Sequence, residues 1–278
     1  MPPLFFIVII AKLVFSCYDF YLTLTHGGNM RNLFALSLVF SFGLFADDHA
    51  DEPEYKLSKA EYYVSVFKKG KDMDDMMAWA EDWAEWASEG EAGEAFADYR
   101  AAILVPLYVS NADEHDLIWV GLNTNPEEQY KANDYWFNNG SKLLAKLPVT
   151  TPQVIDTWQR TVSETPSGQA GYVVYSDCRL GEGVSGEDLY NAYYAYAKAA
   201  QAKGDKAARK MIFPGAGTTP GWDYDYVQAV GTETIAGYGK NWTDFWSGAD
   251  EMPELKALTD LGGSCENERS YAVVPVKQ

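Results

Sequence analysis

The chain repeats itself at a fixed distance, and this repeat constrains its fold more than any other feature. Pro214 lies 108 positions after Pro106, and each proline ends an apolar segment. The same displacement relates further identical pairs, Val66 and Val174, Ala84 and Ala192, Tyr130 and Tyr238, Asn133 and Asn241, Phe137 and Phe245, Gly140 and Gly248, and Leu147 and Leu255. One displacement that serves a whole unit without gaps indicates an internal duplication.

Both copies show the same order of periodicities. Alternating or apolar segments predict strands, and residues at helical spacing predict helices. In the first copy the strands are expected near 62–67, 101–109, 116–122 and 157–163, and the helices over 72–88 and 126–140. In the second copy the strands are expected near 172–178, 207–213, 224–230 and 270–276, with helices from 185 and over 238–246. The order strand–helix–strand–strand–helix–strand, found twice, predicts an α+β fold of two tandem ferredoxin-like units, residues 61–164 and 165–278.

This order makes a prediction about the cysteines. In a ferredoxin-like unit the last strand lies antiparallel beside the first. Cys178 ends the first strand of the second copy, and Cys265 comes just before the last one. We therefore predict a disulfide between Cys178 and Cys265, because an even pair in an oxidising compartment is more often bridged than free. The alternative is two buried, unpaired cysteines.

The expected strands are apolar on both faces. In the segment 116–122, Leu117 and Trp119 point one way, and Ile118 and Val120 the other. A ferredoxin-like sheet has helices on one face only, so its other face needs a cover. The second copy is the obvious cover, and the two units are expected to pack as an intramolecular α+β barrel.

In this arrangement the chain resembles the dimeric α+β barrel superfamily, in which two ferredoxin-like units bring their sheets together, in some proteins as tandem repeats. The resemblance covers nearly all of the chain after its leader and is architectural. The superfamily includes monooxygenases that need no cofactor, haem enzymes and proteins of unknown role. The resemblance implies a pocket between sheet and helices or within the barrel, and it implies nothing about the occupant.

The N-terminal 46 residues are set aside from the fold. They contain two apolar runs, residues 4–15 and 33–45, and both are shorter than the about 20 residues that a membrane span needs. The second run follows Met30 and ends at Ala46, as in a secretory signal peptide.

We therefore predict that residues 1–46 are an upstream segment and a signal peptide, with translation from Met30 and cleavage after Ala46. An acidic tail over 47–60 follows, and the protein is predicted to be periplasmic or secreted. Two alternatives stay open, namely lipidation of Cys17 or retention of one or both runs as membrane anchors.

The chain is strongly acidic, with a net charge of −18. Such a surface repels nucleic acid and anionic lipid and favours solubility or cationic partners, so we expect no nucleic acid partner and no membrane partner after signal cleavage. The sequence shows no spacing typical of a metal site, and we expect no metal and no cofactor. His115, in the turn 112–115, is expected at the surface, although a lone histidine can also be a haem ligand or a base. The oligomeric state is left open.

Candidate site residues come from two patterns. Asn133 and Asn241 each lie on an otherwise apolar helical stripe. Such an asparagine either faces a pocket as a polar group or makes a structural hydrogen bond to the next strand, and we prefer the structural interpretation. The other pattern consists of positions at which the two copies differ. Aromatic rings with a few polar groups occur at these positions, and such a combination is typical either of a ligand pocket or of an ordinary aromatic core. The candidate ligand-binding residues are Tyr224, Tyr226, Gln228, Asn133, Asn241, Trp242 and Trp246.

Three functions are compatible with these patterns. The preferred one is an exported protein that binds a small apolar or aromatic molecule without catalysis. The second is a cofactor-free monooxygenase-like or isomerase-like enzyme that uses the same pocket, for which Asp244 is the candidate general base. The third is an interaction module of the envelope without a ligand.

Overall fold

A computed structural model describes residues 57–110, 114–218, 221–249 and 251–278. The chain divides into two units, Met1–His49 and Ala50–Gln278, and every described residue belongs to the second. The predicted leader, its cleavage point and residues 47–56 of the predicted tail therefore lie outside the described residues. Within these ranges, no helix has both the length and the apolar character needed to cross a membrane.

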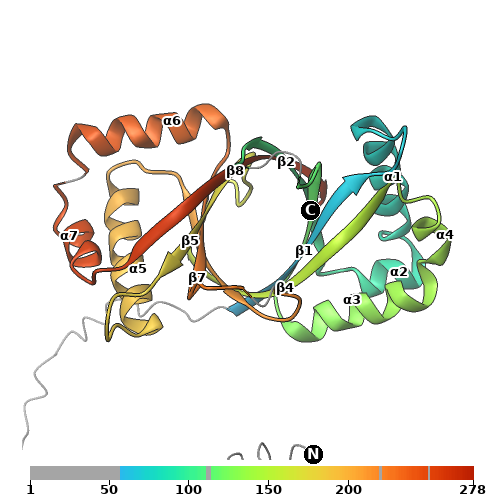
Figure 1. Ribbon diagram of the computed structural model, residues 1–278, viewed down its shortest axis with the longest axis horizontal. Helices are drawn as coiled ribbons and strands as arrows, with labels where there is room; N and C mark the ends of the chain where they lie inside the picture. The colour runs from blue at the N-terminus through green and yellow to red at the C-terminus, as the bar shows by residue number, and fades with distance from the viewer. Residues whose placement is uncertain (1–56, 111–113, 219–220, 250) are drawn as a thin grey trace, which may run out of the picture. The chain divides into compact units, whose positions relative to one another are not determined.

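Eight strands of the described residues form one closed barrel (Figure 1). Around the barrel the order is β1-β3-β2-β8-β5-β7-β6-β4, and all the neighbouring strands are antiparallel. The strands are β1 (Leu57–Phe67), β2 (Arg100–Tyr108), β3 (Leu117–Asn123), β4 (Val149–Ser163), β5 (Tyr172–Arg179), β6 (Ala208–Pro214), β7 (Tyr226–Thr232) and β8 (Ser264–Lys277).

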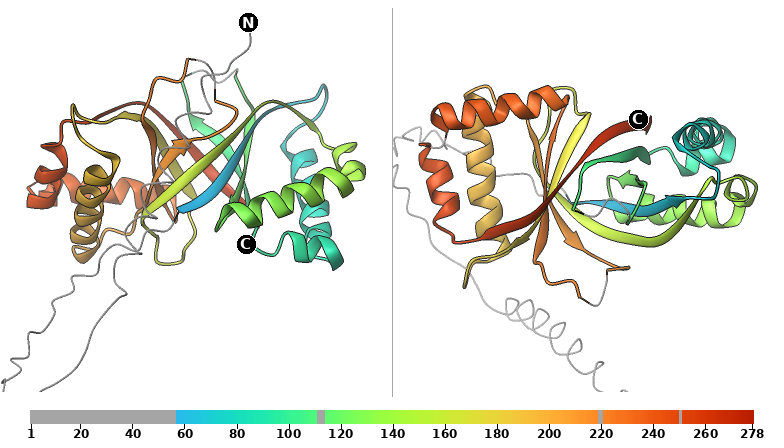
Figure 2. Two further views of the ribbon diagram at one scale, coloured as in Figure 1. Left: turned by 90° about the horizontal axis from the view of Figure 1, so that it is seen from below. Right: turned by 45° about the horizontal axis from the view of Figure 1, so that its top comes forward.

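The helices lie outside the barrel in two groups, one on each half (Figures 1 and 2). The first group covers strands of the first half and consists of α1 (Met73–Trp86), α2 (Gly90–Ala95), α3 (Pro126–Asn139) and α4 (Ser141–Leu144). The second group covers the other half and consists of α5 (Gly186–Ala202), α6 (Ile235–Asp244), the π-helical turn Phe245–Ala249 and α7 (Pro253–Thr259).

Local sequence explains where the long helices begin. Asp72 accepts hydrogen bonds from the backbone at the start of α1, and Ser185 does the same for α5, which begins where the sequence predicts. Asn125 caps α3, and Pro126 occupies its first turn, where a missing N–H costs nothing.

The closure of the barrel corrects one expectation. We expected two sheets that cover each other, but their edge strands also pair, β2 with β8 and β4 with β6. The sheet is therefore continuous around the barrel, and the backbone groups of the edges find partners. The closing pairs use residues 157–163 of β4 and 270–277 of β8, close to the segments that the sequence predicts. Both strands are longer than predicted, and their additional residues, 149–156 and 264–269, pair with β1 and β5.

Strands that are apolar on both faces follow from this closure. One face of each strand fills the barrel interior, where Tyr62, Leu104, Ile118 and Tyr271 pack together. The other face packs against helices, as Trp119 does. β1 begins at Leu57 rather than near 61 because Ala60 is part of the interior, so residues 57–60 belong to the barrel and not to the acidic tail.

Candidate functional site

The first half contains a cavity of about 220 Å³ between its strands and its helices. We call it the aromatic cavity, because seven of its lining residues carry rings, Tyr63, Trp79, Trp83, Phe96, Tyr99, Trp119 and Trp136. Leu144 on α4 and Val154 on β4 also line it, and their exposures of 53% and 42% place them at its mouth. None of the described residues that line this cavity is Lys, Arg or His.

The rings of the aromatic cavity stand at steep angles to one another. The ring of Trp119 meets Trp79 at 74° and Trp83 at 83°, and Trp79 meets Trp136 at 88°. Two indole N–H groups are already used, from Trp79 to the Leu143 carbonyl at 2.9 Å and from Trp119 to the Tyr99 hydroxyl at 3.2 Å. The indoles are thereby held in place, and they offer mainly carbon surface to a ligand.

One carboxylate lies in this aromatic wall. Glu61 projects from β1 and is 4% exposed. Its Oε1 accepts a hydrogen bond from the Tyr99 hydroxyl at 2.9 Å, and its Oε2 accepts from Asn133 Nδ2 at 3.1 Å and from Gln129 Nε2 at 3.4 Å. All of these donors are neutral, and no ion pair of Glu61 occurs in the described part of the chain.

The nearby charges do not balance. Lys59 lies two positions earlier on the same face of β1, but its Nζ is paired with Asp156 Oδ2 at 2.6 Å. Gln129 also donates to Asp156, at 3.0 Å, and thus connects the two acids. The group of Lys59, Glu61 and Asp156 has one formal positive charge and two negative ones. A buried carboxylate without a cationic partner is costly, so the surplus charge on Glu61 is a feature that needs an explanation.

The phenols beside Glu61 remain donors over the physiological pH range. Burial raises the pKa of Tyr63, and the negative field of Glu61 raises it further. The same two causes, in the same order, raise the pKa of Tyr99. Both hydroxyl groups therefore keep their protons, and the Tyr99 hydroxyl donates a hydrogen bond to Glu61.

The second half contains a larger cavity, of about 580 Å³, between its strands and α5, α6 and α7. We call it the polar cavity, because Ser176, Arg209 and Gln228 on the strands and Asp205 before β6 contribute to its lining. Its aromatic lining residues are Tyr193, Tyr196, Tyr238, Trp242 and Phe245.

Most polar groups of this cavity are already paired with one another. Gln228 Nε2 donates to the Tyr193 hydroxyl at 2.6 Å, and burial raises the pKa of Tyr193 to about 12. Arg209 forms an ion pair with Asp205. Asn241 Nδ2 also donates to Asp205, at 3.3 Å.

The structure separates the sequence-predicted site residues. Gln228, Asn241, Trp242 and Asp244 line the polar cavity, and Asn133 lines the aromatic cavity. The others line neither: Tyr226 is buried, Tyr224 lies under the Arg179 guanidinium, and Trp246 is 70% exposed beside Trp242.

Two of the roles expected from the sequence change in detail. Asp244 is partly exposed and its carboxylate is paired with Lys240 one helical turn earlier, so the structure does not present it as a free general base. Asn133 and Asn241 both combine the two interpretations that the sequence left open. Each lines a cavity and each hydrogen-bonds a carboxylate, Glu61 and Asp205 respectively.

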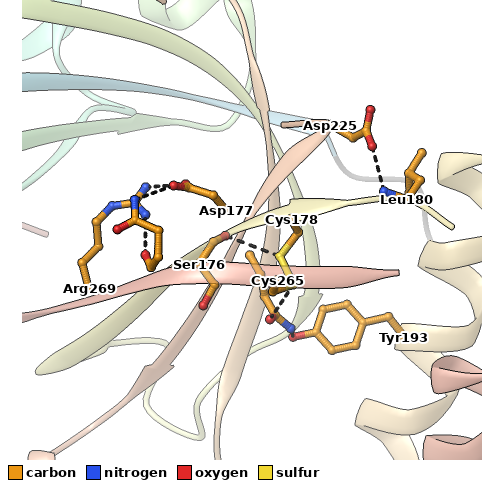
Figure 3. Close-up of a disulfide and its surroundings, with 10 residues drawn as sticks. Ser176, Asp177, Cys178, Leu180, Tyr193, Asp225, Cys265 and Arg269 are labelled. Atoms are coloured by element: carbon orange, nitrogen blue, oxygen red, sulfur yellow. Dashed lines mark hydrogen bonds and ion pairs between the residues drawn. A yellow bond between two sulfur atoms is a disulfide. The ribbon is translucent and has the colours of Figure 1, made fainter. Parts of the chain in front are cut away.

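The predicted disulfide is confirmed. Cys178 on β5 and Cys265 on β8 are bonded, and they face each other in the strand register, so Cys265 lies within the last strand and not before it. Figure 3 shows Tyr193 reaching from α5 toward this bridge. Gln228 Oε1 lies 3.8 Å from Cys265 Sγ, so the bridge borders the polar cavity.

His115 is half-buried rather than exposed, because its Nε2 lies 3.3 Å from the hydroxyl of Tyr271 in the barrel interior. Burial lowers its pKa, and it lines neither cavity. In the residue ranges given above, no three His, Cys, Asp or Glu side chains are grouped so that they could hold a metal ion.

Comparisons with known proteins give distant matches among solved structures. No protein-family profile and no curated protein matches the chain. Among solved structures, a candidate chlorite dismutase is similar with a TM-score of 0.46 and 11% identity, over 80% of this chain and 96% of that one. A haem-binding protein from Thermus thermophilus has a TM-score of 0.44 and 9% identity, over 79% and 91% of the two chains. A mutant chlorite dismutase from Candidatus Nitrospira defluvii has a TM-score of 0.44 and 9% identity, over 80% and 93%.

These comparisons correct the preferred function. We expected an exported protein that binds a small apolar or aromatic molecule without catalysis, whereas the similar structures are named for haem binding and for chlorite dismutation. The closed antiparallel barrel with helices on its outside agrees with the architecture for which the chain resembles the dimeric α+β barrel superfamily.

Proposed function

We propose that the aromatic cavity binds a small organic ammonium ion, with Glu61 as its counter-ion. The observation that carries this proposal is a buried carboxylate with neutral donors only, in the lining of a cavity with seven rings. Aromatic rings attract cations through their negative faces, and cages of such rings are a known solution for quaternary ammonium groups. A cation here would also supply the partner that Glu61 lacks.

The size of the cavity limits the ligand. A volume of about 220 Å³ equals roughly seven water volumes, at about 30 Å³ for each molecule. This is enough for a trimethylammonium head with a short substituent and too small for an extended amphiphile. Each ring in contact contributes about 0.5–2 kcal/mol. The net charge of −18 favours the approach of a cation over that of an anion.

Haem, which one of the similar structures is named for, does not fit the residues present. Haem iron takes His, Cys, Met or Tyr as an axial ligand. The polar cavity has the larger volume, but its described lining contains no His, Met or Cys. Its tyrosines are poor sources of a phenolate, because burial raises the pKa of Tyr193 to about 12 and also raises that of Tyr196 and Tyr238. The described lining of the polar cavity therefore offers no suitable axial ligand for haem iron.

We infer that each half is a ferredoxin-like unit, 57–163 and 172–277, which is supported by the same element order and by the strand orders β4-β1-β3-β2 and β8-β5-β7-β6. We also infer that the protein acts in the periplasm or outside the cell. The Cys178–Cys265 bridge and the signal-like sequence before Ala46 support this compartment.

Tryptophan fluorescence tests the ammonium site, because Trp79, Trp83, Trp119 and Trp136 line it. We expect tetramethylammonium to cause a saturable change in the wild type. The variant Glu61→Gln keeps the size of the side chain and removes the charge, and we expect binding about ten to a hundred times weaker, since hydrogen bonds and contacts to a charged group contribute about 1.5–3 kcal/mol.

Glu81→Gln is the matched control, because Glu81 is exposed on α1 and lines neither cavity. It should bind tetramethylammonium like the wild type. Equal affinity of wild type and Glu61→Gln, with both variants folded by thermal melting, would exclude Glu61 as the counter-ion.

A further inference from the structure

We infer that the polar cavity of the second half is a separate site, and that it fits a neutral carbohydrate. The two cavities occupy matching positions in the two halves, since Asn133 and Asn241, which are related by the internal displacement, line one each. Their chemistry has diverged. The first contains one surplus charge among rings, whereas the second combines rings with many paired polar groups.

The charges of the polar cavity are compensated within the protein. Arg209 is paired with Asp205, and Asp244 is paired with Lys240. The remaining charged residues of the described lining, Lys203 and Glu268, have opposite signs. No single charge is left to select an ion, so the ligand that fits this lining is neutral.

The uncharged polar groups of the cavity both donate and accept hydrogen bonds. Gln228 and Asn241 present amide groups, and Ser176, Tyr193 and Ser247 present hydroxyl groups. A sugar hydroxyl likewise donates one hydrogen bond and accepts two. The internal bonds use Nε2 of Gln228 and Nδ2 of Asn241 as donors, so the two amide oxygens are left to accept from a ligand. A purely apolar ligand would remove these oxygens from water without a donor, which is costly.

Trp242 provides the apolar part of the site. It lines the cavity but is 42% exposed, so part of its ring lies open at the rim. Trp246 stacks on it with an interplanar angle of 20°, and Tyr238 meets it edge-on at 85°. An indole held by its neighbours is suited to the C–H face of a sugar ring, since the ring face is negative and the C–H groups are weakly positive.

Size agrees with this assignment. At about 580 Å³ the polar cavity exceeds the aromatic cavity and lies in the range of ordinary small-molecule sites. It has room for one sugar ring with its substituents, together with water that bridges to the strands. The cavity lies between the strands of the second half and the helices α5, α6 and α7, whose arrangement is shown in Figure 1.

The experiment is calorimetric titration of the full chain with four neutral glycosides, the methyl glycosides of glucose, galactose and mannose, and N-acetylglucosamine. Cyclohexanol serves as the ring without the hydroxyl pattern. We expect saturable binding of at least one glycoside and none of cyclohexanol. Saturation-transfer NMR with the same ligand should show the strongest transfer to the C–H protons of the face that stacks on Trp242.

Two variants make the test specific. Trp242→Ala removes a partly exposed ring and should weaken glycoside binding about tenfold or more. Tyr130→Ala is the matched control, because Tyr130 is the counterpart of Tyr238 in the first half, is 59% exposed and lines neither cavity. It should leave binding unchanged. The inference is overturned if none of the four glycosides binds saturably, if cyclohexanol binds as well as they do, or if folded Trp242→Ala retains full affinity.

Discussion

Asn133 on α3 donates a hydrogen bond from Nδ2 to Glu61 Oε2 on β1 over 3.1 Å, and this bond joins a helix to the barrel at the wall of the aromatic cavity. Its counterpart Asn241 makes a longer bond, 3.3 Å, to Asp205, which also has Arg209 as an ionic partner. The same residue type at matched positions therefore supports two carboxylates that differ in how well they are compensated.

This difference predicts unequal costs of removing the two amides. Asn133→Ala leaves a buried carboxylate with one donor fewer, so we expect a loss of about 1–3 kcal/mol in the free energy of unfolding, measured with urea. Asn241→Ala is the matched control and should lose less, because the Arg209 pair and the Ala207 amide still hold Asp205. A larger loss for Asn241→Ala would contradict the special role given to Glu61.

The disulfide should stabilise the chain through the unfolded state. It closes a loop with a sequence separation of 87 residues, and such bridges typically contribute about 2–4 kcal/mol. We expect a reductant to lower the urea midpoint of the wild type, and the double variant Cys178→Ala, Cys265→Ala to show that lower midpoint with or without reductant. If the wild-type midpoint is the same in both buffers, the bridge does not limit unfolding.

Alkaline pH should destabilise the fold through buried phenols. Burial raises the pKa of Tyr62 and of Tyr193 from 10.0 to about 12. Between these values the unfolded chain loses the phenol protons while the folded chain keeps them, so stability is complete below pH 10 and falls as the pH rises toward 12. Each buried tyrosine contributes a slope of about 1.4 kcal/mol per pH unit.

Urea titrations at several alkaline pH values test this slope. The variants Tyr62→Phe and Tyr193→Phe should each lower stability at neutral pH and flatten its decline above pH 10. Tyr130→Phe is the control, since Tyr130 is exposed and should leave the slope unchanged. Phenolate absorbance in the native protein should appear for the two buried residues only near pH 12, and a normal titration of Tyr62 would contradict their burial.

Haem should not bind to a defined site in this protein. The polar cavity is the larger of the two, but its described lining contains no His, Met or Cys that could ligate the haem iron. Titration with hemin, followed by absorbance, should therefore give no saturable band of ligated iron. Saturation at one equivalent, with loss of the band in a Tyr193→Phe variant, would show that a phenol supplies the axial ligand after all.

The α+β class could be predicted from the sequence, because long amphipathic elements leave a clear periodic signal. The strands near Ile103 and Ile212 and the bridge between Cys178 and Cys265 were predicted in this way. The short helices α2, α4 and α7 were not predicted, since four to seven residues are too few for a periodic pattern. Pairing of β2 with β8 and β4 with β6 depends on contacts between the halves, which local patterns do not contain.

The candidate sites were predicted less well from the sequence than the fold was. Glu61 was missed because an alternating strand with Glu61, Tyr63 and Ser65 on one face suggests a face in water, whereas helices cover it. Trp79 and Trp83 were interpreted as packing, which they are, but they also form the cavity wall. On that face of β1 Lys59 balances Glu61, and the surplus negative charge arises only because β4 brings Asp156 beside them. Local patterns do not contain this contact between strands, so they gave no signal for the site.

We propose that the aromatic cavity recognises positive charge and not merely apolar bulk. The most direct measurement compares, by calorimetry on the wild type, choline with its neutral isostere in which a tert-butyl group replaces the trimethylammonium group. The two ligands share shape and volume, so their difference reports on charge alone. We predict that choline binds at least about tenfold more tightly, a difference of about 1.4 kcal/mol. Equal affinity, or tighter binding of the neutral isostere, would contradict the account.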